Sequence, residues 1–156
     1  MMARAPFQVL VLLYRRDAGA HLEYAVFRRA DNGLWQGIAG GGDDGETPRE
    51  AAVREIREEA GMTTNELLPL GVVGMISVEH FRERDSWDPA VREIPEYAFA
   101  VRAEGSEIAL SSEHMDVAWL TFEQALACLR WESNCVALRE LHHRLSATPD
   151  ASSPRW

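Results

Sequence analysis

The chain has 156 residues, a length that suits one domain, and 46% of them are hydrophobic, which is enough to build a core. Its formal net charge is −9, so bulk attraction to DNA, RNA or an anionic membrane is unfavourable. We therefore expect neither a nucleic-acid polymer nor a membrane as a partner.

The cysteine content and the apolar runs indicate a cytoplasmic protein. Cys128 and Cys135 are spaced for neither a disulfide framework nor a zinc site, and we expect both to be small buried residues on C-terminal helices. The longest apolar run, residues 9–14, is too short to cross a bilayer, and no small-residue cleavage site follows it.

The first part of the chain predicts two paired strands and two loops. Residues 7–14 are almost continuously apolar, which is typical of a buried strand. Residues 21–28 alternate and predict a second strand, joined to the first by a turn at 17–20. We expect residues 30–37 to form a loop, and the glycine-rich residues 40–45 to form another that leads into a helix.

That helix has well-marked ends. Thr47 can cap its start, Pro48 suits the first turn, and Glu50 completes a capping box with Thr47. Gly61 is a stop signal. An apolar stripe predicted to face the core consists of Val53, Ile56 and Ala60.

Further strands follow this helix. Residues 67–79 are rich in Val, Ile and Leu and predict one long strand, bulged at a glycine. Residues 80–93 are polar and predict a long loop of the kind that is often functional. Residues 96–102 and 117–120 predict two more strands, with a turn at Glu104-Gly105 and a loop at residues 111–114 between them.

The C-terminal part is helical. Thr121 and Gln124 form a second capping box, which opens a helix to about residue 130, and Ser133 is expected to cap a last helix to about residue 145. Residues 147–156 are rich in Pro and Ser and predict a disordered tail after a single domain at 1–146. This order of strands and helices suits a mixed sheet with helices on both faces.

The central helix carries a cluster of acidic residues. Glu55, Glu58 and Glu59 are spaced i, i+3, i+4 and therefore share one face, where each like-charged pair costs about 0.2–0.5 kcal/mol. A cation there would turn this cost into a gain, and Mg²⁺ commonly bridges carboxylates to substrate phosphates. A solvated acidic face would have the same composition.

The stretch 40–62 resembles the Nudix box at every specified position. These positions are Gly40, Glu46, Arg54, Glu55, Ile56, Glu58, Glu59, Gly61 and Met62. The resemblance to the Nudix hydrolase family implies an α/β/α sandwich with a mixed sheet and the box at its centre. It also implies Mg²⁺-dependent cleavage, with Mn²⁺ as a substitute, of a small diphosphate-containing substrate.

The resemblance also implies a metal-ligand set. The side-chain ligands would be Glu55, Glu59 and Glu58, ranked in that order because the first two lie one full turn apart, and the backbone carbonyl of Ala39 would add another. A further acid usually comes from a loop beyond the central strands, and here Glu113 is the candidate, as a ligand or as the base for the attacking water. Which glutamate acts as the base stays open.

A second implied feature is structural. Arg54 and Glu46 are expected to pair and to hold the loop against the helix, whereas a plain surface ion pair of Arg54 with Glu50 is the alternative. The box glycines are expected to permit tight backbone geometry near phosphate.

The flanks of the box are similar to bacterial dihydroneopterin triphosphate pyrophosphohydrolases. The similar clusters are Arg28-Arg29, Leu34-Trp35-Gln36, Ile38-Ala39-Gly40, Ser112-Glu113-His114, Trp119-Leu120 and residues 131–134. Residues 41–44 depart from that subfamily's pattern, so the substrate stays open. The resemblance implies hydrolysis to a monophosphate and pyrophosphate.

Several residues are candidates for contacting the substrate. Arg28 ends a strand and is a candidate for a phosphate or base contact, although a solvated arginine would look the same. Trp35 can stack on a flat heterocycle or serve as the edge of the core. Ala39 and Gly40 would lie beside the substrate, and Phe81 is a candidate pocket wall or a plain surface-loop residue.

Two other functions remain open at this stage. The first is a hydrolase of dNTPs, oxidised nucleotides or nucleoside-diphosphate sugars. The second is a ligand sensor without catalysis, against which the intact box argues. The sequence does not reveal which phosphorus is attacked, how many metal ions bind or the oligomeric state.

Overall fold

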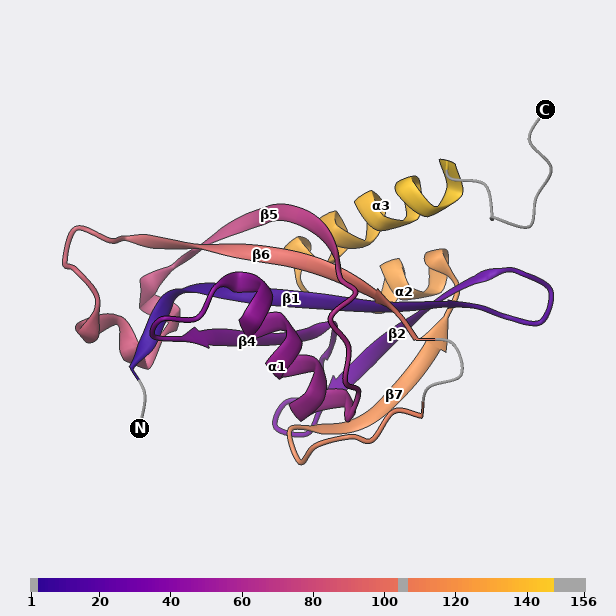
Figure 1. The fold of residues 1–156 in the computed structure, drawn as a ribbon, viewed down its shortest axis with the longest axis horizontal. Helices are drawn as coiled ribbons and strands as arrows, with labels where there is room; N and C mark the ends of the chain where they lie inside the picture. The colour runs from indigo at the N-terminus through magenta and orange to yellow at the C-terminus, as the bar shows by residue number, and fades with distance from the viewer. Residues whose placement is uncertain (1–2, 104–106, 148–156) are drawn as a thin grey trace.

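The computed structural model describes residues 3–103 and 107–147. Figure 1 shows a mixed sheet with α1 on one side and with α2 and α3 on the other, the expected α/β/α sandwich. The elements are β1 (Arg4–Arg16), β2 (Leu22–Arg29), β3 (Trp35–Gln36), β4 (Ile38–Asp43), α1 (Pro48–Ala60), β5 (Leu68–Ser77), η1 (Val78–His80), η2 (Arg82–Ser86), β6 (Glu93–Arg102), β7 (His114–Leu120), α2 (Phe122–Cys128) and α3 (Glu132–Ala147).

The long strand β1 organises the sheet. It runs antiparallel to β4 and to β2, and parallel to β6 on its other edge. Strand β5 continues the sheet beyond β6, while β3 and β7 pair with β2. Because β1 pairs with β4, the segment before α1 lies in the middle of the molecule.

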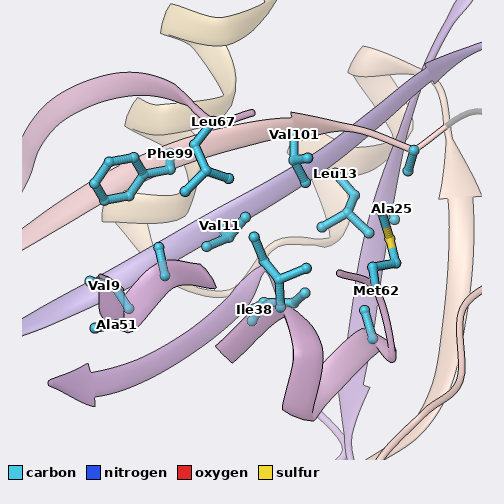
Figure 2. Close-up of a cluster of buried hydrophobic side chains, with 14 of the residues drawn as sticks. Val9, Val11, Leu13, Ala25, Ile38, Ala51, Met62, Leu67, Phe99 and Val101 are labelled. Atoms are coloured by element: carbon cyan, nitrogen blue, oxygen red, sulfur yellow. The ribbon is translucent and has the colours of Figure 1, made fainter. Parts of the chain in front are cut away.

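Alternate residues of β1 pack on opposite faces of the sheet, because side chains alternate along a strand. Val9, Val11 and Leu13 belong to the core cluster on the α1 face (Figure 2). Leu10 and Leu12 belong to the cluster under α2 and α3. All five are buried, each contributing about 1.5–3 kcal/mol of hydrophobic stabilisation. The continuous apolar run is therefore explained by a sheet that is covered on both sides.

Helix α1 has the ends that the sequence predicts. The side chain of Thr47 accepts from the Glu50 N–H, and the Glu50 side chain accepts from the Thr47 N–H. Gly61 follows the helix in the left-handed conformation at φ 68°. The buried apolar residues are Ala51, Ala52, Ile56 and Ala60, whereas Val53 is only half-buried.

The prediction of a loop at residues 40–45 is wrong for its first part, because β4 extends to Asp43. The reason is close packing. A Cβ at Gly40, Gly41 or Gly42 would come within 3.0 Å of the side chains of Glu55, Arg4 and Phe7, respectively. The glycines allow β4 to lie against α1 and β1, and they do not form a flexible loop.

Several other boundaries also differ. Helix α3 begins at Glu132, so Ser133 lies inside it and does not cap it, while the carbonyl of Trp131 accepts from the N–H groups of Asn134 and Cys135. The expected loop 80–93 contains η2, and the loop 30–37 contains β3.

The remaining predictions concern β5 and the segments at the ends of the described ranges. Register shifts beside Gly71 and Gly74 confirm that β5 is bulged. The predicted turn at Glu104-Gly105 lies outside the described residues. Helix α3 includes Ala147, and the rest of the predicted tail lies outside the described residues as well. Within the described ranges, no helix has the length and apolar character needed to span a membrane.

Candidate active site

Three carboxylates of α1 form the centre of the site. Glu55, Glu58 and Glu59 each present an oxygen within 4.8 Å of the oxygens of the other two. Glu55 and Glu59 are 7% and 3% exposed, whereas Glu58 is exposed to solvent. The predicted spacing therefore brings the three acids together, with two of them held inside the protein.

Arg54 fixes the position of this cluster. Its guanidinium donates to both carboxylate oxygens of Glu46 at 2.9 and 3.0 Å, and to the carbonyl of Gly41 at 2.8 Å. It also donates to Glu55 at 3.0 Å and to Glu58 at 3.2 Å. The expected pairing with Glu46 is present in the structure. Arg54 thus joins β4 to α1 and holds two of the three cluster carboxylates.

Burial makes the cluster electrostatically unfavourable without a cation. The pKa of Glu55 is raised to about 7, first by burial and then by the charges of Glu58 and Glu59, although Arg54 opposes the shift. A buried group of carboxylates that offers only oxygen donors suits a hard divalent cation such as Mg²⁺. The donor set therefore fits the metal that the sequence implies.

Glu113 reaches the cluster from outside α1. Its pKa is raised, first by burial and then by the neighbouring carboxyl group of Glu59. Its backbone is fixed, because its N–H donates to the Ser111 hydroxyl at 3.2 Å and its carbonyl accepts from the Ala30 N–H at 2.9 Å. The structure therefore places Glu113 beside Glu59, where a fourth acid was expected.

Two further residues contact Glu59 and were not predicted. The Ser111 hydroxyl donates to Glu59 Oε2 at 2.7 Å. His114 Nδ1 lies 3.0 Å from the same oxygen, a distance typical of an ion pair, although the ring is not aligned for a hydrogen bond. Burial lowers the pKa of His114 more than Glu59 raises it, which favours the neutral imidazole. Ser111 and His114 flank Glu113 in the Ser-Ser-Glu-His run, from which Glu113 alone was predicted as a site residue.

A cavity of about 480 Å³, here called the α3 cavity, lies beside the start of α3. Its lining includes Ala39, Gln36, Glu96 and Trp131, so β3, β4, β6 and the start of α3 all contribute. Its size is in the range of small-molecule sites. The residue after Ala39 is Gly40, which packs closely against Glu55 on the α1 face of the sheet, so β4 runs between the cavity and the carboxylates.

A second cavity, of about 620 Å³, lies against Glu55 and is here called the Arg4 cavity. Its lining includes the basic residues Arg4 and Arg82. The Arg4 guanidinium lies over the Phe81 ring, 4.6 Å from its centroid, and donates to Gln8 and to Glu83. The sequence pattern did not single out Arg4, because its position depends on the pairing of β1 with β4.

Three of the predicted substrate contacts lie elsewhere. The Arg28 guanidinium donates to the Gly33 carbonyl at 3.1 Å, and Arg28 does not line the α3 cavity. Trp35 packs at the edge of the core under α2 and α3. Phe81 packs against Arg4 and Trp87 rather than lining that cavity.

The neighbouring residues occupy the cavity wall instead. Arg29 and Gln36 line the α3 cavity where Arg28 and Trp35 were expected. The pKa of Arg29 is raised first by its hydrogen bonds with Asp31 and, to a smaller extent, by the charges of Glu113 and Glu59, so its guanidinium is within electrostatic range of the carboxylates. The predicted residues Arg28 and Trp35 are thus sequence neighbours of residues that line the α3 cavity, Arg29 and Gln36.

The comparisons with known proteins agree with this geometry. The NUDIX domain family matches residues 6–141. A dihydroneopterin triphosphate diphosphatase from Haemophilus influenzae is 28% identical over 85% of this chain and 84% of its own length. An asymmetrical bis(5'-nucleosyl)-tetraphosphatase from Mus musculus is 31% identical over 82% of this chain and 84% of its own.

Solved structures show the same fold. A protein from Listeria monocytogenes described as a Nudix hydrolase superposes with a TM-score of 0.80 at 34% identity, covering 91% of this chain and 95% of its own. The dihydroneopterin triphosphate pyrophosphohydrolase of E. coli superposes with a TM-score of 0.74 at 24% identity, covering 92% and 99%. With the complete box folded into a carboxylate cluster beside a cavity, the chain belongs to the Nudix family and is a Nudix hydrolase.

Proposed function

We propose that this protein is a Mg²⁺-dependent pyrophosphohydrolase that cleaves a nucleoside- or pterin-type triphosphate, foremost dihydroneopterin triphosphate, to a monophosphate and pyrophosphate. The observation that carries the proposal is the carboxylate cluster of α1 together with the α3 cavity, whose lining includes Arg29, a residue within electrostatic range of Glu59 and Glu113. The cavity can hold a heterocycle while its phosphates reach the carboxylates. The activities named for the Haemophilus influenzae and E. coli relatives support this choice of substrate.

The carboxylates would hold the metal. Glu55 and Glu59, with Glu58, Glu113 and the carbonyl of Ala39, form the ligand set, and Mn²⁺ can replace Mg²⁺. When bound, the ion neutralises phosphate charge and lowers the pKa of water, so that a nucleophile forms near neutral pH.

The chain's own residues supply the remaining steps. Arg54 keeps Glu55 and Glu58 in position through its contacts with Glu46 and Gly41. Glu113 is placed to accept a proton from the attacking water, because the Ser111 hydroxyl that contacts Glu59 also accepts from the Glu113 N–H, which holds the two acids close together.

Cationic side chains near the cluster can stabilise the phosphates. Arg29 lines the α3 cavity near Glu59 and Glu113, and Arg4 and Arg82 line the Arg4 cavity on the side of Glu55. Guanidinium groups suit phosphate oxygens because they donate in a fixed, forked geometry. In a chain with a net charge of −9, these local cations offset the repulsion of a polyphosphate.

A second candidate is the hydrolysis of a dinucleoside tetraphosphate. The Arg4 cavity favours it, since this space of about 620 Å³ on the other side of Glu55 could hold a longer polyphosphate. The mouse relative is named for that activity. Hydrolysis of dNTPs, oxidised nucleotides or nucleoside-diphosphate sugars is the broader alternative.

One substrate panel separates these activities. The parent protein is assayed with Mg²⁺ on dihydroneopterin triphosphate, the four dNTPs, ADP-ribose and a dinucleoside tetraphosphate. We expect kcat/KM to be at least about tenfold higher for dihydroneopterin triphosphate than for ADP-ribose or the dinucleotide, a difference of about 1.4 kcal/mol in transition-state binding. Preference for either of those two would overturn the proposal, and the absence of turnover on the whole panel would favour a sensor.

A further inference from the structure

Glu96 is a buried acid that belongs neither to the Nudix box nor to the carboxylate cluster of α1. It lies on β6, is 4% exposed and lines the α3 cavity. Among the described residues no hydrogen-bond partner reaches its Oε1. Burial raises the pKa of Glu96, and a hydrogen bond with the Ser133 hydroxyl opposes the shift only in part. A buried carboxyl oxygen without a hydrogen-bond partner is destabilising, so the presence of Glu96 Oε1 in a cavity points to a ligand.

The position of Glu96 on β6 directs its side chain toward α3. Residues 98 and 100 of β6 pack in the core under α3, and Glu96 shares their face because side chains alternate along the strand. Its neighbours across the sheet are Gln8 on β1 and Gly74 on β5, and both line the same cavity. The absence of a side chain at Gly74 leaves space beside the carboxyl group.

Two other hydrogen-bond acceptors in the cavity lining already accept hydrogen bonds from the protein. Gln36 Oε1 accepts from the Trp131 indole N–H at 3.2 Å, and Asn134 Oδ1 accepts from the Gly37 N–H at 2.8 Å. Two large apolar side chains in the lining, Met75 and Trp131, are 54% and 44% exposed. Exposed apolar groups around a cavity are typical of a ligand-binding groove, and they suit the faces of a flat ring.

We propose that Glu96 determines specificity by accepting two hydrogen bonds from the 2-amino-4-oxopyrimidine edge that pterins and guanine share. This inference rests on the proposed function and narrows its substrates to that class. The edge offers a ring N–H and an adjacent NH₂, two parallel donors that match the two oxygens of one carboxylate. Adenine instead presents an NH₂ beside a ring nitrogen with a lone pair, which faces the second oxygen unfavourably.

The test measures binding without metal or turnover. The affinities of neopterin, guanosine, inosine and adenosine are measured by calorimetry on the parent protein, Glu96→Gln and Glu93→Gln. Glu93 is the matched control, because it lies on the same strand but is exposed and does not line the α3 cavity. We expect the parent to bind guanosine at least about tenfold more tightly than inosine, which lacks the 2-amino group, and than adenosine.

The two variants should then differ in their affinities for these ligands. Glu96→Gln should weaken neopterin and guanosine at least about tenfold and remove the preference over adenosine, because an amide offers one acceptor and one donor. Glu93→Gln should stay within about twofold of the parent. Equal affinities of the parent for guanosine, inosine and adenosine would overturn the inference even if Glu96→Gln did not fold, as would a Glu96→Gln variant that binds like the parent.

The two proposals can fail separately. If the parent prefers guanosine and neopterin but hydrolyses no triphosphate, the proposed function fails and the role of Glu96 stands. If the parent hydrolyses dihydroneopterin triphosphate while Glu96→Gln retains the parent's binding and KM, the role of Glu96 fails and the proposed function stands.

Discussion

Glu113 shows how a single acid can join a site from a distant part of the chain. It lies in the loop before β7, more than fifty positions after the box glutamates, and its carboxyl group nevertheless meets that of Glu59. Sequence similarity predicted this residue. The contacts of Glu59 with Ser111 and His114 were not predicted, because they depend on how that loop folds against α1.

Replacing Glu113 should impair catalysis without unfolding the protein. We expect Glu113→Gln to lower kcat by at least about a hundredfold, since general-base assistance is worth about 10²–10⁴-fold. The melting temperature should stay constant or rise slightly, because the change removes repulsion with Glu59. Both quantities are measured at saturating Mg²⁺, with the exposed Asp116→Asn as control. A kcat within a few-fold of the parent would move the search for the distal acid to residues 80–93.

Glu55 should make the stability of the metal-free protein depend on pH. Its pKa is 4.5 in the unfolded reference and about 7 in the folded protein, so in this window the folded state binds more protons. Its contribution to stability is therefore complete below about pH 4.5 and is lost as the pH rises through 7. Each unit of raised pKa corresponds to about 1.4 kcal/mol.

Thermal unfolding in a chelator tests this dependence. Between pH 5 and pH 8 the stability of Glu55→Gln should fall less than that of the parent, because the amide does not titrate. Glu66→Gln, a change at an exposed position after α1, controls for the loss of one charge. If the stability of Glu55→Gln fell with pH in parallel with that of the parent, the titration of Glu55 would not be the cause of the fall.

At the scale of elements, α1 and β4 illustrate what local sequence can and cannot predict. The caps of α1 use neighbouring residues, Thr47, Glu50 and Gly61, so its limits could be predicted from the chain itself. Strand β4 consists largely of glycines, whose lack of side chains gives no alternating pattern. Its conformation comes from pairing with β1, which local sequence does not show.

The close packing of β4 on α1 gives a prediction for Gly40. A Cβ there would collide with the Glu55 carboxylate, so Gly40→Ala should displace a metal ligand. We expect a kcat at least about tenfold lower and a smaller rise in melting temperature on addition of Mg²⁺. The control is Gly71→Ala in β5, outside both cavities, where a Cβ would meet no atom within 4 Å and only the strain of a positive φ is added. Equal kcat values and equal rises in melting temperature with Mg²⁺ in the two variants would show that the collision between residue 40 and Glu55 does not matter.

At the scale of the whole molecule, the sandwich brings three separate segments to one site. Helix α1 supplies the carboxylates, the loop before β7 supplies Glu113, and β3, β4, β6 and α3 enclose the cavity. The fold class and the acidic cluster were predictable, because the box is contiguous in sequence. Arg4, Arg29 and Glu96 were not, because strand pairing alone brings them to the cavities.

We propose that the carboxylate cluster supports the hydrolysis of a triphosphate to pyrophosphate and a monophosphate. Glu59→Gln tests it directly, since the amide keeps the size of the side chain and can still accept from Ser111 but lacks the charge that a metal requires. The measurement is the release of pyrophosphate from dihydroneopterin triphosphate with saturating Mg²⁺, with circular dichroism as the check on folding. We expect pyrophosphate as the product of the parent and no measurable turnover by a folded Glu59→Gln. Release of orthophosphate by the parent, or a near-normal kcat in the variant, would contradict the account.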